Sequence, residues 1–310
     1  MSRRSRQLLA ALVAAPWCIW AVVRLLALDA GWPVVPALSF TPWVALTSVL
    51  PIVFALLMRS WSVAVIATVT ALALGSVLID RVTVDDQPAT SGRLITLMTS
   101  NTLAGEADAN QLMRLVREHD VDVLALQELT PDLVLTLRQS GLERELPYGI
   151  DESRWAVAGA GLWSRSPLRK GARTDPRFWA APEGVIGDLD LRVRSIHPSP
   201  PITPDAEARW QENLASMPSA RSTDKQLRIL AGDFNATLDH RAFRRLIERG
   251  YTDAAESVGK GLIRTWPNRG KTPLTIDHVL VDRRIRVERL DVYSIDDTDH
   301  RAMVVELRLP

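Results

Sequence analysis

Three long apolar runs in the first part of this chain constrain its fold more than any other feature. The runs cover about residues 7–28, 34–58 and 60–79. A helix that crosses a lipid bilayer needs roughly 20 predominantly apolar residues. The only charged residues from Leu8 to Ile79 are Arg24, Asp29 and Arg59. We therefore expect residues 1–80 to be a membrane anchor of three transmembrane helices, with the lipid bilayer as a partner.

Prolines affect how the second run can fold. Pro36 suits the start of a helix, whereas Pro42 or Pro51 should kink the span, because proline lacks an N–H and its ring clashes with the preceding turn. A cleaved signal peptide followed by buried core helices is the alternative interpretation. That alternative suits one apolar run, but not three in succession.

The arginines predict the orientation of the anchor. Arg3, Arg4 and Arg6 precede the first run and Arg59 lies between the second and third, whereas the first loop offers only Asp29 and a contribution from Arg24. Cytoplasmic loops carry an excess of Lys and Arg, so the N-terminus is expected in the cytoplasm. An odd number of spans then places everything after residue 79 outside the cytoplasm, in an integral protein of the cell membrane.

Composition limits what the rest of the chain can be. The 310 residues have a formal net charge of +1, which gives no electrostatic argument for bulk nucleic-acid binding. The single cysteine, Cys18, lies in the first apolar run, so the polar region contains neither a disulfide nor a thiolate metal site. Nothing indicates an obligate protein partner.

The polar region alternates strand and helix patterns behind a segment, residues 81–92, of linker composition. We predict strands at residues 93–100, 121–126, 157–164, 188–196, 227–231, 276–281 and 302–307. We predict helices at residues 107–119, 205–217 and 241–250, with another that begins near Thr130-Pro131. This alternation indicates an α/β domain with a central sheet over residues 93–310.

Polar side chains stand at the ends of these apolar strands, where active sites of α/β folds usually form. They are Asn101, Glu128, His197, Asp233, Asn235, Asp277, His278, Asp299 and His300. Oxygen donors suit Mg²⁺ or Mn²⁺, and a His beside an Asp is an oriented proton carrier or, when charged, a phosphate clamp. Each residue alone is more often a turn, cap or buried hydrogen-bonded group, which is our interpretation of His119 and His240. The ordered set carries the prediction.

The series TSN, LQE, GAGLWSR, SIH, GDFN, IDHVL and TDH, from about residue 93 to 309, resembles the endonuclease/exonuclease/phosphatase superfamily. GDFN and the final Asp-His are its most specific parts. The resemblance implies a four-layer α/β sandwich, in which two packed mixed sheets are flanked by helices and the site lies at one end. It also implies an enzyme that hydrolyses phosphoester bonds.

The resemblance further implies a role for each carboxylate and amide. Glu128 resembles the family's principal metal ligand, and Asn101 and Asp299 would complete the site for Mg²⁺ or Mn²⁺. Asp233 would position or deprotonate the attacking water, and Asn235 would hold the phosphate.

The histidines are assigned in the same way. His300, oriented by Asp277, would contact the scissile phosphate or act in proton transfer, and His197 would be a phosphate contact or a general acid. Two positions depart from the family pattern: Thr298 replaces a commoner Ser and keeps the hydroxyl, and His278 replaces a Tyr and is expected in the pocket wall.

Family resemblance does not choose a substrate, because function resides in the loops around a shared site. We expect a membrane-anchored phosphodiesterase, most similar to a nuclease; the alternative is a lipid-headgroup phosphoesterase, similar to sphingomyelinases or phosphoinositide phosphatases. A catalytically silent binding module is disfavoured by the intact set. Trp266 could stack a base or cover a lipid or sugar, or simply pack on its own loop. Arg264, Arg269 and Lys271 could bind phosphate or be solvated charges.

Overall fold

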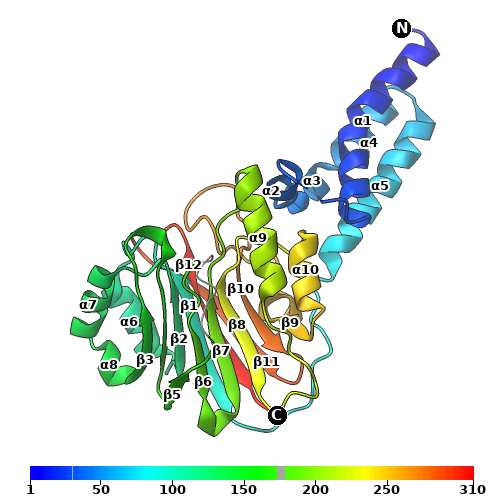
Figure 1. The fold of residues 1–310 in the computed structure, drawn as a ribbon. Coiled ribbons are helices and arrows are strands. Elements are labelled where there is room, and N and C mark those ends of the chain that lie inside the picture. The colour runs from blue at the N-terminus through cyan, green and yellow to red at the C-terminus, as the bar shows by residue number, and fades with distance from the viewer. Residues whose placement is uncertain (30, 173–178) are drawn as a thin grey trace.

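The computed structural model describes residues 1–29, 31–172 and 179–310. Five N-terminal helices, here called the helical bundle, project from a layered α/β domain (Figure 1). The bundle consists of α1 (Arg3–Leu25), α2 (Val34–Leu38), α3 (Thr41–Thr47), α4 (Val49–Leu57) and α5 (Trp61–Ile79).

Two mixed six-stranded sheets form the centre of the α/β domain. The first has the order β11-β12-β1-β2-β4-β3, with β1 (Leu94–Asn101), β2 (Val123–Gln127), β3 (Tyr148–Glu152), β4 (Ala160–Ser164), β11 (Arg286–Ser294) and β12 (Arg301–Arg308). The second has the order β5-β6-β7-β8-β10-β9, with β5 (Leu168–Lys170), β6 (Glu183–Ile186), β7 (Leu191–Ile196), β8 (Leu227–Asp233), β9 (Tyr251–Asp253) and β10 (Asp277–Asp282). Within each sheet one pair is parallel, β1 with β2 and β7 with β8.

Helices cover the outer face of each sheet, which completes the layered arrangement. Between the sheets lies a core that includes Leu97, Val193 and Val305. The first sheet is covered by α6 (Ala109–Glu118), α7 (Pro131–Gln139) and α8 (Leu142–Glu145), and the second by α9 (Pro204–Ser216) and α10 (Arg241–Ile247). The short α11 (Ala254–Ser257) follows β9. The expected α/β sandwich of two mixed sheets flanked by helices is confirmed.

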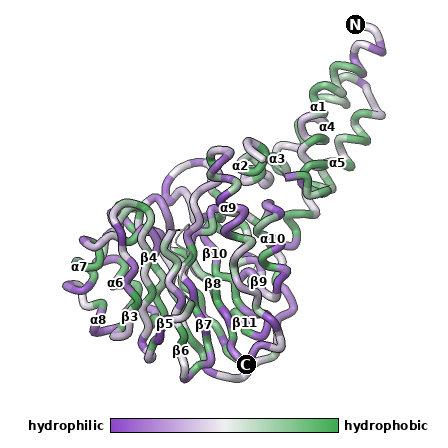
Figure 2. Tube along the Cα trace, viewed as in Figure 1, coloured by the Kyte–Doolittle hydropathy of each residue, from purple (hydrophilic) through white to green (hydrophobic). Residues whose placement is uncertain are grey.

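The second apolar run does not form the single long helix expected for residues 34–58. It is divided into α2, α3 and α4. Among the described residues, only α1 and α5, both largely hydrophobic in Figure 2, are long and apolar enough to cross a membrane by length and composition, and Thr41–Leu57 is too short. Pro42 lies in the first turn of α3, and α3 ends at Thr47, four residues before Pro51. Pro51 cannot donate to the carbonyl of Thr47 and its ring clashes there, which accounts for the break at Ser48.

The helical bundle has a defined internal direction. Gln7 near the start of α1 donates to the Ser62 hydroxyl near the start of α5 at 3.2 Å. Arg24 at the end of α1 and Arg81 after α5 both bond to Asp239 of the α/β domain. The helices α1 and α5 therefore run in the same direction, from the distal end of the bundle toward the domain, and α4 returns between them (Figure 1).

Residues 81–92 lie against the α/β domain along their length. Val84 forms an isolated bridge with Val258, and the Gln87 side chain bonds to both backbone groups of Val287. Gly92 donates its N–H to the Leu309 carbonyl. The segment of linker composition is thus a bound strap that fixes the bundle to the domain.

Candidate active site

Strand pairing brings the predicted polar residues to one end of the sandwich. Because β1 and β2 are parallel, Asn101 pairs with Gln127 and lies beside Glu128. Because β7 and β8 are parallel, Ile196 pairs with Gly232, so His197 and Asp233 follow side by side. Asp277 is directly opposite Asp233 across the antiparallel pair of β8 and β10.

Asn101 joins two carboxylates in the centre of the site. Its Nδ2 donates to Glu128 Oε1 and to Asp233 Oδ2, both at 3.1 Å, and its Oδ1 accepts the Leu103 N–H at 3.0 Å. This hydrogen-bond pattern fixes the direction of the amide. Glu128 also accepts the Ala104 N–H at 2.9 Å and has a left-handed backbone, with φ of 53°. Backbone strain of this kind is concentrated at functional sites.

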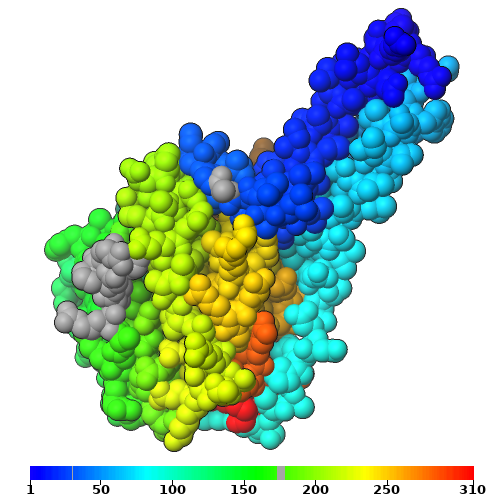
Figure 3. All heavy atoms as spheres, turned by 45° about the vertical axis from the view of Figure 1, so that its right-hand side comes forward, coloured from blue at the N-terminus to red at the C-terminus, as the bar shows by residue number. Residues whose placement is uncertain are grey.

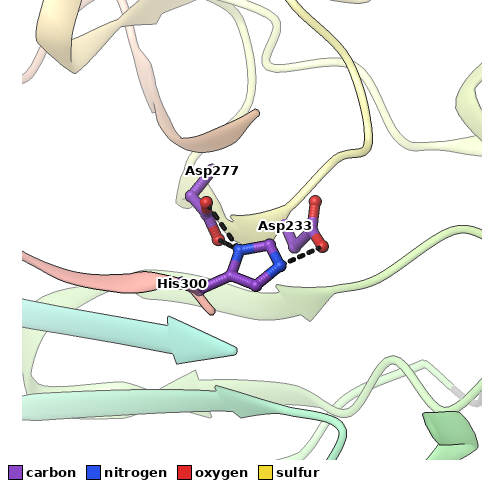
Figure 4. Close-up of side chains that lie close together, drawn as sticks. All are labelled: Asp233, Asp277 and His300. Atoms are coloured by element: carbon purple, nitrogen blue, oxygen red, sulfur yellow. Dashed lines mark hydrogen bonds and ion pairs between the residues drawn. The ribbon is translucent and has the colours of Figure 1, made fainter. Parts of the chain in front are cut away.

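His300 lies between two buried carboxylates (Figure 4). Its Nδ1 donates to Asp277 Oδ2 at 2.9 Å, and its Nε2 faces Asp233 Oδ2 at 3.6 Å. Potential ligand atoms of these three residues lie within 4.8 Å of one another, a spacing that could suit a metal ion. The imidazole itself occupies the space between the carboxylates, so we interpret this group as a proton-handling relay.

The hydroxyl of Thr298 positions the final Asp-His. Thr298 Oγ1 donates to the Asn101 carbonyl at 3.0 Å and accepts the His300 N–H at 3.2 Å. A Ser or a Thr can make both bonds, which explains why the hydroxyl is the part of this residue that the site needs.

Asp299 has a carboxylate oxygen that could bind a hard cation. Asp299 Oδ2 accepts from Trp266 Nε1 at 2.8 Å, but its Oδ1 is buried and accepts no hydrogen bond from any described residue. The charged His300 Nε2 lies 3.9 Å from this oxygen, too far for a hydrogen bond, and a bound cation would satisfy the oxygen directly. Carboxylate oxygens are the donors that Mg²⁺ and Mn²⁺ prefer.

The environment separates the proton affinities of the site residues. Burial raises the pKa of Asp233 to about 7, and burial also raises the pKa of Glu128. Burial alone would lower the pKa of His300, but Asp277 and Asp233 raise it to about 10. Burial together with the neighbouring His300 lowers the pKa of His197 to about 3. Near neutral pH the site therefore holds a charged His300, a neutral His197 and an Asp233 poised to take a proton.

His197 and Asn235 complete the wall of the site. His197 Nε2 is 3.5 Å from Glu128 Oε1 and 3.6 Å from Asp233 Oδ2, and its ring packs on Trp179 with centroids 4.7 Å apart. Asn235 donates from Nδ2 to the Pro198 carbonyl at 3.0 Å, and its backbone N–H donates to Asp233.

The expectation for His278 is wrong. Successive residues of a strand point to opposite faces, so Asp277 faces the site and His278 faces α10. His278 is fully buried, bonds to Asp253 Oδ2 at 2.7 Å and to the Ala236 carbonyl at 2.9 Å, and packs on Phe243. It supports the core and forms no part of the pocket wall.

A cavity of about 460 Å³ opens onto these residues, and we call it the catalytic cavity. Its lining includes Glu128, His197, Asp233, Asn235 and His300, together with Trp179, Trp266 and Ile202. It also includes Pro36, Ser39 and Phe40 of the helical bundle. Of these added residues, only Trp266 was singled out from the sequence as a possible substrate contact. Trp179 and the α2–α3 segment carried no local signal, because they reach the site through tertiary packing.

The comparisons with known proteins agree with this geometry. A sequence model of the Endonuclease/Exonuclease/phosphatase family matches residues 98–300. A search of curated protein sequences found no match. Similar solved structures include the 3'-5' exonuclease of Neisseria meningitidis, at 20% identity and TM-score 0.56 over 69% of this chain and 100% of that one.

Two further structures share the fold. An endonuclease/exonuclease/phosphatase from Beutenbergia cavernae is 17% identical, with TM-score 0.54 over 70% of this chain and 72% of that one. D. rerio TDP2, solved with a single-strand DNA product, is 14% identical, with TM-score 0.53 over 69% of this chain and 99% of that one. The family match covers most of the chain, and the chain therefore belongs to the endonuclease/exonuclease/phosphatase family and is a phosphoester hydrolase.

Proposed function

We propose that this protein is a membrane-held, Mg²⁺- or Mn²⁺-dependent enzyme that hydrolyses phosphodiester bonds. The observation that carries the proposal is the arrangement of a charged His300 and a proton-accepting Asp233 beside the carboxylates of Glu128 and Asp299, the second of which has an oxygen without a hydrogen bond from any described residue. In the overall reaction, water adds a hydroxyl to phosphorus and the proton passes to the departing ester oxygen.

The protein's own groups would act on the water and on the phosphate. Asp233 would accept a proton from the attacking water, since its raised pKa of about 7 suits a general base at neutral pH. His300, held by Asp277, would present Nε2–H to a phosphoryl oxygen and stabilise the charge that develops there. His197 and Asn235 would hold the other oxygens. Because His197 stays neutral, we propose that it contacts phosphate and is not the general acid.

Glu128 and Asp299 would hold the metal ion. Asn101 has one oxygen lone pair left after its bond to Leu103, so it could add a ligand while its NH₂ group positions Glu128 and Asp233. When bound, the ion would supply Lewis-acid stabilisation of charge on the phosphoryl group.

Membrane attachment is supported by the exposure of the bundle. Apolar side chains on its outer faces remain uncovered, for example Leu12, 62% exposed on α1, and Leu72, 69% exposed on α5. Core helices of soluble proteins bury such faces, and α5 is too far from the N-terminus to be a signal sequence. A bilayer would cover these surfaces.

The direction of the helices supports three passes and the predicted orientation. If α1 and α5 both cross the bilayer toward the domain, the chain must cross back between them through α3 and α4. Arg3, Arg4, Arg6 and Arg59 all belong to the distal end of the bundle, whereas Arg24 and Arg81 at the domain end are paired with Asp239. The positive-inside rule then places the distal end in the cytoplasm and the catalytic domain outside it. A C-terminal reporter that is active only in the cytoplasm would refute this orientation.

Two classes of substrate are supported by specific observations. A nuclease-like activity is supported by the family and by the DNA-bound relative, and Trp266 lines the cavity where a base could stack. A lipid phosphoester is supported by the contribution of the helical bundle to the cavity wall. A silent binding module is disfavoured, because the residues to which we assign base, phosphate-binding and metal-binding roles lie together at one end of the sandwich.

The full chain, purified in lipid nanodiscs, tests the proposal directly. We expect it to hydrolyse bis(p-nitrophenyl) phosphate with Mg²⁺ or Mn²⁺, and expect His300→Ala and Glu128→Ala to lose that activity. A half-buried histidine offers a matched control: His119 is at the C-terminal end of α6, stacks on Tyr293, and is not a site residue, so His119→Ala should retain that activity. Unchanged turnover in His300→Ala would dismiss the assigned site.

A further inference from the structure

A second cavity lies where the helical bundle meets the α/β domain, and we call it the junction cavity. It has a volume of about 410 Å³, within the range of small-ligand sites. Its walls come from α3 and α5 on one side and from loops of the domain on the other. Most of the lining is apolar, including Trp43, Leu46, Leu78, Leu238, Leu262 and Leu274.

The junction cavity adjoins the catalytic cavity. Ser39 and Leu274 line both, so the two meet at the turn between α2 and α3. The neighbouring Phe40 faces the catalytic side, and Pro42 the junction side. The apolar junction cavity thus borders the cavity that contains Asp233 and His300.

Buried polar contacts hold this wall in place. His240 Nδ1 accepts the Thr237 N–H, so Nε2 carries the proton and donates to the Val35 carbonyl of α2 at 2.8 Å. Asp29 accepts the Arg241 N–H. Figure 3 shows the N-terminal helices, in blue, packed against the yellow-orange part of the chain that contains α10. The α2–α3 turn is therefore a fixed part of the wall of the catalytic cavity. The side chains that hold it, His240 and Asp29, are almost fully buried.

The position of the cavity indicates its occupant. Its α3 and α5 walls belong to helices whose outer faces are apolar and exposed, with Leu46 68% exposed beside the opening. A hydrocarbon chain could pass from the apolar surroundings of these helices into the cavity without crossing water. The one cation in the lining, Arg81, is bonded to Asp239, so the cavity offers no free charge for a phosphate within the described residues.

We propose that the junction cavity binds a hydrocarbon chain of a membrane lipid whose phosphodiester is presented to Asp233 and His300. This inference rests on the proposed phosphodiesterase function and names its substrate class. The lipid headgroup occupies the catalytic cavity, and its chain leaves past Ser39 and Leu274 toward α5.

Gly75 of α5 provides the test variant. It lines the junction cavity, and a Cβ placed there meets no atom within 4 Å, so a larger side chain enters open space without strain. Gly75→Leu should fill part of the cavity and improve helix propensity. Ser76→Leu adds the same side chain one residue later, on the exposed face of α5, and is the matched control.

Photolabelling tests the cavity without requiring turnover. Full-length protein in nanodiscs is irradiated with a hexadecylphosphocholine that carries a diazirine near the end of its chain. We expect labelling at Leu238 or within residues 261–275, lost in Gly75→Leu and retained in Ser76→Leu. Labels confined to outward residues of α1 and α5, or equal labelling in both variants, would overturn the inference.

Hydrolysis separates the two proposals. The substrates are ethyl and hexadecyl p-nitrophenyl phosphate, which share a leaving group. Each buried methylene contributes roughly fourfold to binding, so excluding two of them should lower the hexadecyl-to-ethyl ratio of kcat/KM more than about tenfold in Gly75→Leu. An unchanged ratio, or faster cleavage of a single-stranded oligonucleotide with no chain labelling, argues against a lipid site. Failure to cleave either ester with Mg²⁺ or Mn²⁺ refutes the catalytic proposal instead, while the labelling still decides the cavity.

Discussion

The ion-pair cluster around Asp239 joins the helical bundle to the catalytic domain, and Asp239→Asn would remove its negative charge. Asp239 Oδ1 accepts from Arg24 Nε and Arg81 Nη2, both at 2.6 Å, and Oδ2 accepts from Arg81 Nη1 at 2.9 Å. The exposed fractions of the side chains are 0% for Asp239, 3% for Arg81 and 11% for Arg24. Arg244 also bonds to the Leu238 carbonyl nearby.

The loss of stability expected for Asp239→Asn follows from the burial of these side chains. Removing one partner of a buried ion pair leaves an uncompensated charge and costs about 3–5 kcal/mol. Here two guanidinium groups lose their counter-charge at once, and Arg244 adds a third positive charge. For a domain of this size that loss corresponds to a fall in Tm of roughly 6–20 °C.

Thermal unfolding in nanodiscs measures the loss of stability in Asp239→Asn. Limited trypsin digestion shows which part of the protein becomes accessible. We expect Asp239→Asn to expose the Arg81 bond to cleavage before the domain unfolds. Glu288→Gln is the control: its partners Arg286 and Arg308 are 40% and 32% exposed, so it should cost less than about 1 kcal/mol. A Tm for Asp239→Asn no lower than that of Glu288→Gln would refute the stabilising role of the ion-pair cluster around Asp239.

The effect should also depend on pH. Burial alone would raise the pKa of Asp239, but Arg81 and Arg24 hold it below its ordinary value. A carboxyl with a lowered folded pKa stabilises above its unfolded pKa of about 3.9, and that stabilisation is lost as the pH falls through the folded value. The difference in Tm between wild type and Asp239→Asn should therefore persist at neutral pH and shrink below about pH 4.

Three further predictions address the site and its surroundings. Asp277→Asn should lower kcat about 10²–10⁴-fold and move the basic limb of the pH–rate profile to lower pH, because the pKa of His300 falls once Asp277 no longer raises it; activity within threefold of wild type contradicts this role. Removal of divalent ions with EDTA should abolish hydrolysis of bis(p-nitrophenyl) phosphate, with recovery on Mg²⁺ or Mn²⁺ addition, and isothermal titration should show weaker Mn²⁺ binding in Glu128→Gln. Burial, followed by the charge of Asp253, raises the pKa of Glu256 from 4.5 to about 7. Ionisation of Glu256 therefore destabilises the fold increasingly between about pH 4.5 and 7, and fully above pH 7. Glu256→Gln should raise the free energy of unfolding by up to about 3 kcal/mol at pH 8 and leave it unchanged near pH 4, which thermal unfolding at the two pH values would show.

The interior strands could be predicted from the sequence, and the edges could not. Every strand predicted from apolar pattern, such as residues 227–231 within β8 and 302–307 within β12, is present. The missed strands are β3, β5, β9 and β11, which are all sheet edges, and β6, which lies beside an edge. An edge strand is buried on fewer sides, so its sequence carries a weaker apolar signal.

The same distinction applies to the site. Asn101, Glu128, Asp233 and Asp277 stand at strand ends, so the alternation of apolar strands and polar termini was enough to find them. The ring of His278 could not be placed from its motif alone, because a neighbour in sequence lies on the opposite face of the strand. Contacts between regions far apart in the chain, such as Phe40 with the catalytic cavity, depend on tertiary packing and leave no local pattern.

A single loop joins the candidate active site to the helical bundle. Residues 233–240 carry Asp233 and Asn235 at the site, Leu238 in the junction cavity, and Asp239 and His240 in contact with the bundle. The loop is internally bonded, with the Thr237 N–H donated to His240 Nδ1 and the Asp239 N–H to Thr237 Oγ1. A displacement of α2 would therefore move the same short segment that positions Asp233. Since buried hydrogen-bonded segments shift as units, the helical bundle is a structural part of the candidate active site.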